Sequence, residues 1–147
     1  MLNLPIQAHH LRELKSMLKD VYFFDDLTVK NIDAVCRALT LNPYKRKSKV
    51  ICEGEIGKSF HLIYSGSVRV YRGRTFFRRG QQIADLLQGE FFGEVALISS
   101  NPRNATVVCL EECQIFSLTR TAFDSIVENN KEFEEAIERI ARQRDSY

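Results

Sequence analysis

Hydrophobic residues recur at helical spacing near the start of the chain. In residues 9–20, leucines and a methionine return every three or four positions, which predicts an amphipathic helix. The carboxylate-rich segment 25–28 offers N-terminal caps for a second helix. We expect this second helix to be stopped by Asn42-Pro43, because proline disfavours helical geometry in the residue before it.

The same spacing returns near the C-terminus. Segments 121–128 and 131–144 each carry an apolar stripe between polar residues, which is typical of helices that pack one face on a core. Helices are therefore expected on both sides of the central part of the chain.

The centre of the chain contains short hydrophobic runs separated by glycine or acidic turns. These runs cover residues 50–52, 60–64, 68–71, 81–87, 105–110 and 113–118. We expect runs 60–64 and 68–71 to form a hairpin about residues 65–67, Ser-Gly-Ser. Short strands at this spacing predict a small antiparallel barrel or roll.

Composition places the chain among soluble globular domains. It has 147 residues, of which 44% are hydrophobic and 27% are charged, with a net charge of +2. One compact domain is expected at this length. The charge is too small to indicate a nucleic-acid or membrane partner, and no run approaches the roughly 20 apolar residues of a membrane span.

Two further features leave alternatives open. The cysteines Cys36, Cys52, Cys109 and Cys113 all have apolar neighbours, which favours buried reduced thiols over a disulfide or a metal site. Residues 72–80 form a basic tip that also holds two phenylalanines. This tip is interpreted as a solvated hairpin, and contact with nucleic acid or lipid is the alternative.

The candidate chemistry lies in residues 91–107. Gly93 permits close backbone approach, and the short helical turn expected after it would point free N–H groups at an anion. Arg103 follows Glu94 by nine positions, so a loop can bring both side chains to one pocket. An arginine that pairs with a phosphate and a carboxylate that accepts a sugar hydroxyl suit a cyclic ribose phosphate.

The runs FGEVALI and PRNATV within this segment resemble the phosphate-binding cassette of cyclic-nucleotide-binding domains. Residues 53–63 and Gly66 resemble that family's strand–turn–strand. The resemblance implies an α+β fold. Its centre is an antiparallel β-roll of the double-stranded β-helix or jelly-roll kind, flanked by N-terminal helices and by two C-terminal helices that form a lid.

The resemblance also implies domain limits. Residues 1–20 would be the end of a helical linker, and residues 21–147 the cyclic-nucleotide-binding domain. Within that domain, the roll would occupy residues 41–119 and the C-terminal helices residues 120–144.

Ligand contacts are implied at Gly93, Glu94, Val95, Ala96, Arg103, Asn104, Ala105, Leu86 and Arg144. Arg103 matches the phosphate-binding arginine, and Arg144 a helix arginine that caps the base. Asn104 stands where the family often has Thr, Ser or Ala, which leaves the choice between cAMP and cGMP open, with cAMP preferred.

No catalytic constellation accompanies these residues. The three histidines lie beside no plausible nucleophile, and no His-x-His metal pattern is present. We therefore expect a binding module without metal or cofactor, whose ligand is cAMP or cGMP, rather than an enzyme.

The expected setting is regulatory. Residues 4–24 are similar to the end of the linker before the nucleotide domain of bacterial cyclic-nucleotide-gated potassium channels, so a cytoplasmic domain of a tetrameric membrane channel is the first interpretation. In this interpretation the fragment binds no nucleic acid and does not insert into the membrane. A sensor domain of a transcription regulator or a kinase regulatory subunit is the alternative.

Overall fold

A computed structural model describes residues 3–19, 29–73, 78, 80–126, 135, 138, 139 and 142. Helices α1 (Ala8–Lys19) and α2 (Val29–Ala38) precede the strands, and α3 (Arg120–Ile126) follows them. The helical spacing at both ends is thus confirmed over these residues, while the expected caps in 25–28 lie outside the described residues. Across the described chain, no helix combines the length and apolar character needed to span a bilayer.

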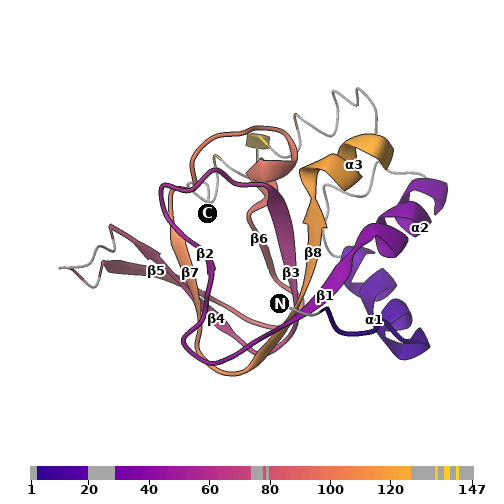
Figure 1. Ribbon diagram of the computed structural model, residues 1–147, viewed down its shortest axis with the longest axis horizontal. Coiled ribbons are helices and arrows are strands. Elements are labelled where there is room, and N and C mark those ends of the chain that lie inside the picture. The colour runs from indigo at the N-terminus through magenta and orange to yellow at the C-terminus, as the bar shows by residue number, and fades with distance from the viewer. Residues whose placement is uncertain are drawn as a thin grey trace.

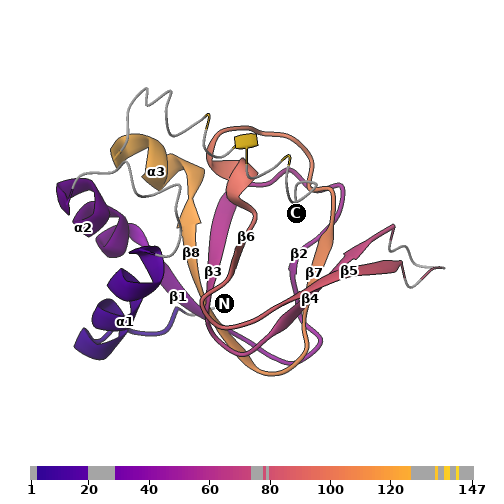
Figure 2. The same cartoon turned by 180° about the vertical axis from the view of Figure 1, so that it is seen from behind.

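In the part of the chain that the structure describes, eight strands form two four-stranded antiparallel sheets that face each other. The strands are β1 (Thr40–Tyr44), β2 (Lys49–Ile51), β3 (Ser59–Ser65), β4 (Val68–Arg72), β5 (Gln81–Leu86), β6 (Phe91–Phe92), β7 (Thr106–Cys109) and β8 (Cys113–Thr119). One sheet has the order β1-β8-β3-β6 and the other β2-β7-β4-β5. Helices α1, α2 and α3 lie on one side of this roll, whereas the β4–β5 hairpin projects from the opposite side (Figures 1 and 2). The expected α+β roll is confirmed.

Two hydrophobic clusters lie on either side of the first sheet. Alternate residues of β3 explain this, because successive side chains of a strand point to opposite faces. Phe60 and Leu62 pack with the helices, whereas Ile63 faces the interior of the roll with Ile115 and Val70. The first sheet is therefore buried on both faces, and it connects the interior of the roll to the helices.

The expected hairpin between residues 60–64 and 68–71 is wrong. β3 and β4 belong to different sheets, and β4 pairs with β5 and β7 instead. Gly66 allows this crossing because its φ is +94° and because a Cβ there would lie 2.6 Å from Cys113 Sγ. The Ser-Gly-Ser turn therefore carries the chain from one sheet to the other.

The expected role of Asn42-Pro43 as a helix stop is also wrong. Helix α2 ends at Ala38, and both residues lie within β1. β1 is the outermost strand of its sheet, and an edge position tolerates proline because a strand there need not donate from every N–H group.

Three other predictions concern the hairpin tip, the cysteines and the lid helix, and the described residues cover them in part. Strands β4 and β5 pair down to Arg72 and Gln81, which confirms the hairpin, but its tip at 74–77 and 79 lies outside the described residues. All four cysteines are free thiols. Among the described residues, no group of three or more His, Cys, Asp or Glu side chains could hold a metal ion. Most of the expected lid helix, including Arg144, lies outside the described residues.

Candidate functional site

The short helix expected after Gly93 is present. β6 ends at Phe92, and the 3₁₀ turn η2 (Glu94–Leu97) begins after Gly93, whose φ is +76°. A Cβ at Gly93 would lie 2.8 Å from Arg103 Nη1 and 3.1 Å from the Ser59 carbonyl oxygen. A glycine is needed here both for the left-handed backbone and for the close approach of the arginine.

The turn between β2 and β3 holds the backbone of Arg103. The Arg103 N–H donates to the Glu55 carbonyl at 2.6 Å, and the Gly54 N–H donates to the Arg103 carbonyl at 2.7 Å. A third bond runs from the Gly57 N–H to the Asn101 carbonyl at 3.5 Å. These bonds fix where the arginine side chain leaves the backbone.

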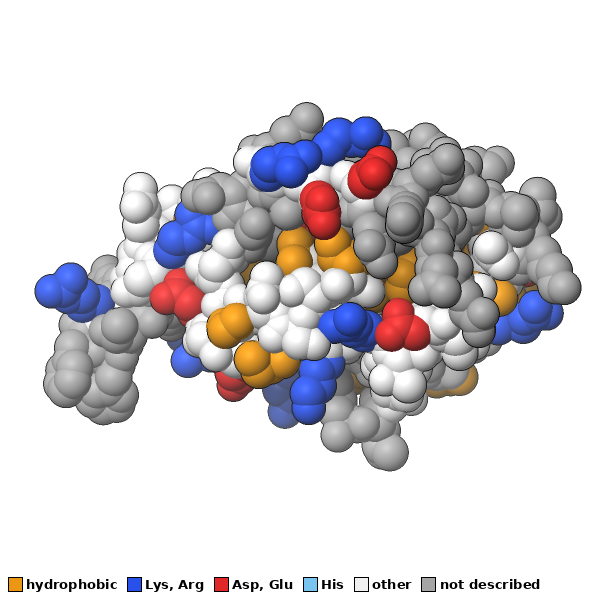
Figure 3. All heavy atoms as spheres, turned by 90° about the horizontal axis from the view of Figure 1, so that it is seen from above, with side chains coloured by type: hydrophobic (Ala, Val, Ile, Leu, Met, Phe, Trp, Pro, Cys, Tyr) orange, Lys and Arg blue, Asp and Glu red, His pale blue; other side chains and the backbone are white. Residues whose placement is uncertain are grey.

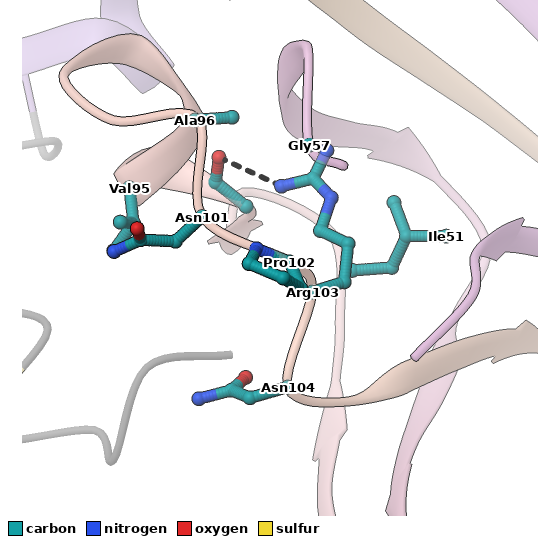
Figure 4. Close-up of a pocket in the computed structure, with 9 residues that line it drawn as sticks. Ile51, Gly57, Val95, Ala96, Asn101, Pro102, Arg103 and Asn104 are labelled. Carbon is teal, nitrogen blue, oxygen red and sulfur yellow. Dashed lines mark hydrogen bonds between the residues drawn. The ribbon is translucent and has the colours of Figure 1, made fainter. Parts of the chain in front are cut away.

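The guanidinium of Arg103 lies in a slot between two glycines. It donates from Nη2 to the Ser59 carbonyl at 2.7 Å and from Nη1 to the Gly93 carbonyl at 3.2 Å, the dashed line in Figure 4. On its other side a Cβ at Gly57 would lie 2.8 Å from Arg103 Cζ. Because neither glycine has a Cβ, the guanidinium group can lie close to both of their backbones.

A cavity of about 190 Å³ opens beside this slot. It is lined by Ile51, Gly57, Gly93, Val95, Ala96, Asn101, Pro102, Arg103 and Asn104. Figure 3 looks onto this end of the roll, where hydrophobic side chains are visible between charged side chains of both signs.

Five of the residues expected at the site therefore meet at one cavity: Gly93, Val95, Ala96, Arg103 and Asn104. Glu94, Ala105 and Leu86 do not line it. Ala105 and Leu86 are buried in the cluster inside the roll, and the Glu94 side chain is fully buried.

Burial and nearby carboxylates act on Arg103 in opposite directions. Burial lowers the pKa of the Arg103 guanidinium, whereas the negative charges of Glu94 and Glu55 raise it. Glu94 therefore acts electrostatically on Arg103 from behind the cavity wall. The cavity presents a partly desolvated cation, which strengthens its attraction for an anion.

His61 lies on the interior side of β3 near the same arginine. Its Nδ1 is 2.8 Å from Ser117 Oγ, and its ring stacks on Phe92 with centroids 5.0 Å apart. Burial, together with the positive charge of Arg103, lowers the pKa of His61 to about 3. The imidazole is therefore neutral and packs between Ser117 and Phe92, in keeping with a structural role.

Sequence reasoning did not assign four residues that line the cavity. Gly57 lies in the segment 53–63 that carried the resemblance, and Asn101 and Pro102 lie inside the segment 91–107, so their positions could have indicated them. Ile51 resembled any core strand residue, and no local signal distinguishes it.

A partly buried cation beside a cavity at the end of an antiparallel β-roll is an arrangement suited to an anionic ligand. The profile of the cyclic nucleotide-binding domain family matches residues 41–130 of this sequence, more than half of the chain. The chain belongs to the cyclic nucleotide-binding domain family.

Known proteins resemble the chain in sequence and in fold. The cAMP-dependent protein kinase regulatory subunit of Candida albicans is 32% identical over 113 residues, covering 77% of this chain and 24% of the relative. The cGMP-dependent protein kinase of Toxoplasma gondii is 28% identical over 124 residues, covering 84% of this chain and 12% of the relative. The chain thus spans a quarter or less of the length of these two relatives.

One solved structure illustrates the likeness in fold. The regulatory domain of Toxoplasma gondii PKA, crystallised with cAMP, superposes with a TM-score of 0.76 at 22% identity. The superposition covers 90% of this chain and 50% of the other chain. At this identity the likeness concerns the fold alone.

Proposed function

We propose that this chain is a regulatory module that binds a cyclic nucleotide, with cAMP as the first candidate, and that Arg103 binds the cyclic phosphate. The observation that carries the proposal is the position of Arg103, which is partly buried in a slot of two glycines and lines a cavity. A phosphate diester is an anion whose oxygens accept charge-assisted hydrogen bonds from a guanidinium group.

Other residues of the site are proposed to contact the same cyclic nucleotide. The backbone around Gly93 and Ala96 lines the cavity and would approach the phosphate and sugar closely. Glu94 is proposed to accept a ribose hydroxyl, with its side chain turning from its buried position. Contacts from Asn104, Ala105, Leu86 and Arg144, and closure of the C-terminal helices as a lid, stay predictions.

A kinase-type setting is better supported than a channel. The relatives reported above are a kinase regulatory subunit and a cyclic-nucleotide-dependent kinase, and they give no support to channel gating or to a membrane parent. We propose that the parent protein regulates a protein kinase and that its partner is a kinase catalytic unit. We further propose that this module has no enzymatic activity of its own and acts in the cytoplasm.

Titration calorimetry of Arg103→Ala tests the ligand proposal. We expect the variant to bind cAMP at least about tenfold more weakly, because a charge-assisted hydrogen bond contributes about 1.5–3 kcal/mol. Arg37→Ala removes the same charge from an exposed position on α2 and should leave affinity unchanged. Equal affinities in the wild type and Arg103→Ala would contradict the proposal, and cGMP in the same assay decides the nucleotide preference.

A further inference from the structure

Arg120, the first residue of α3, contacts two segments that belong to the site. Its backbone N–H donates to the Lys58 carbonyl at 2.9 Å. Its side chain donates from Nη1 to Ser100 Oγ at 2.7 Å. Within α3 itself, its Nε lies 3.7 Å from Asp124 Oδ2.

Both segments lead directly to Arg103. Ser100 lies three residues before it in the chain. Lys58 ends the turn between β2 and β3, and the earlier part of that turn holds the backbone of Arg103 through Glu55. Arg120 therefore joins the start of α3 to the two backbone segments that position the phosphate-binding arginine.

We infer that Arg120 is a positioning residue that couples occupancy of the cavity to α3 through its hydrogen bond to Ser100. This inference rests on the proposed function. Arg103 donates two of its five N–H groups to the Ser59 and Gly93 carbonyls. A ligand phosphate that accepts from the remaining N–H groups would pull on the guanidinium and on the segment that carries it. Ser100 moves with that segment, and its bond transmits the displacement to the first turn of α3.

The hydrogen bond between Arg120 and Ser100 is expected to contribute little to the stability of the fold. Ser100 is exposed, and the Arg120 side chain is 36% exposed, so water can replace the bond when either partner is removed. α3 also keeps its apolar attachment, because Phe123 and Leu97 belong to the same buried cluster. Loss of the Arg120–Ser100 bond should therefore reduce coupling while leaving the fold and the phosphate contact intact.

Hydrogen–deuterium exchange of residues 121–126, measured with and without saturating cAMP, tests the inference. In the wild type we expect cAMP to change the exchange rates of these amides. Ser100→Ala and Arg120→Ala should each lose at least about half of that change while their cAMP affinity stays within about threefold of wild type. Arg120→Lys, which keeps a donor, should restore part of it.

Asp124→Ala is the matched control, because it removes the longer contact of the same arginine and should keep the full response to cAMP. Full responses in Ser100→Ala and Arg120→Ala would overturn the inference, and so would an affinity loss of tenfold or more in both. A wild type that binds cAMP with no change in α3 also overturns it, while leaving the proposed function intact. A wild type that binds no cyclic nucleotide refutes the proposed function instead.

Discussion

At the scale of single residues, Gly57 matters for the side chain that it lacks. Arg103 is confined between Gly57 and Gly93, and a Cβ at either position would lie 2.8 Å from an atom of its guanidinium. Gly57 has no positive φ, so alanine suits its backbone and acts only through the arginine.

Gly57→Ala is therefore expected to weaken cAMP binding about three- to tenfold, because the guanidinium must leave the slot and lose part of its alignment with the phosphate. Titration calorimetry measures the loss, and circular dichroism checks that the fold is retained. Lys58→Ala, at an exposed neighbouring position, is the control. Wild-type affinity in Gly57→Ala would show that a methyl group at this position does not displace the guanidinium of Arg103.

A second residue, His61, makes stability depend on pH. Its pKa is lowered to about 3 in the folded protein from an ordinary value of 6.5, chiefly by burial. Between these two values the unfolded chain binds a proton that the folded protein does not. The free energy of unfolding should therefore fall as the pH falls through this window, by at most about 1.4 kcal/mol per pH unit.

Urea denaturation at about pH 7 and about pH 5 measures this slope. His61→Gln cannot titrate and can still bond Ser117, so it should show a shallower slope than the wild type. His10→Gln is the comparison variant. Burial also lowers the pKa of His10, but the positive charge of Arg103 is not among the causes of that lowering. Equal slopes in His61→Gln and the wild type would mean that His61 is protonated in the fold.

At the scale of elements, the turn at Gly66 decides which sheet each strand joins. A Cβ there would lie 2.7 Å from the Glu112 carbonyl oxygen as well as close to Cys113 Sγ. The turn between β3 and β4 therefore packs directly against the start of β8, and the two sheets are held together at this point.

Gly66→Ala should lower the free energy of unfolding by at least about 2 kcal/mol, because a left-handed alanine is strained and its methyl group overlaps backbone. Gly73→Ala is the matched control. Its φ is +77° but a Cβ would meet nothing within 4 Å, so only the conformational cost of about 1 kcal/mol is expected. Chemical denaturation compares the two, and similar losses would contradict the packing at the crossing.

At the scale of the whole molecule, ligand binding and folding are linked. A ligand that binds only the folded state stabilises it by about 2.7 kcal/mol at a concentration one hundred times its Kd. We expect cAMP to raise the midpoint of thermal unfolding accordingly. At the same concentration Arg103→Ala, with tenfold weaker binding, should gain only about 1.4 kcal/mol.

Differential scanning fluorimetry with a cAMP titration measures both gains. Adenosine, which has no phosphate, is the control ligand and should produce little shift in either protein. Equal stabilisation by cAMP and adenosine would mean that the phosphate contributes nothing.

Much of the fold follows from local patterns in the sequence. The helical spacing of 9–20 and 121–128 and the apolar runs of the centre correspond to α1, α3 and the strands. Residues 91–107 also predict the short helical turn after Gly93. They predict one pocket for both Arg103 and Glu94, but the cavity is lined by Arg103 and not by Glu94. In these segments the side-chain period and the glycine position determine the backbone over a few residues.

Strand pairing and the slot around Arg103 depend on contacts between distant parts of the chain. Local spacing favoured pairing β3 with β4, but burying two facing apolar layers places them in opposite sheets. Gly57 faces Arg103, which lies 46 positions further along the chain, and Arg120 meets Ser100 across 20 positions. The sequence by itself determines the helices, the strands and the presence of the Arg103 guanidinium. Packing of the two sheets places that guanidinium between two glycines, because hydrophobic burial brings together surfaces from segments that are far apart in the sequence.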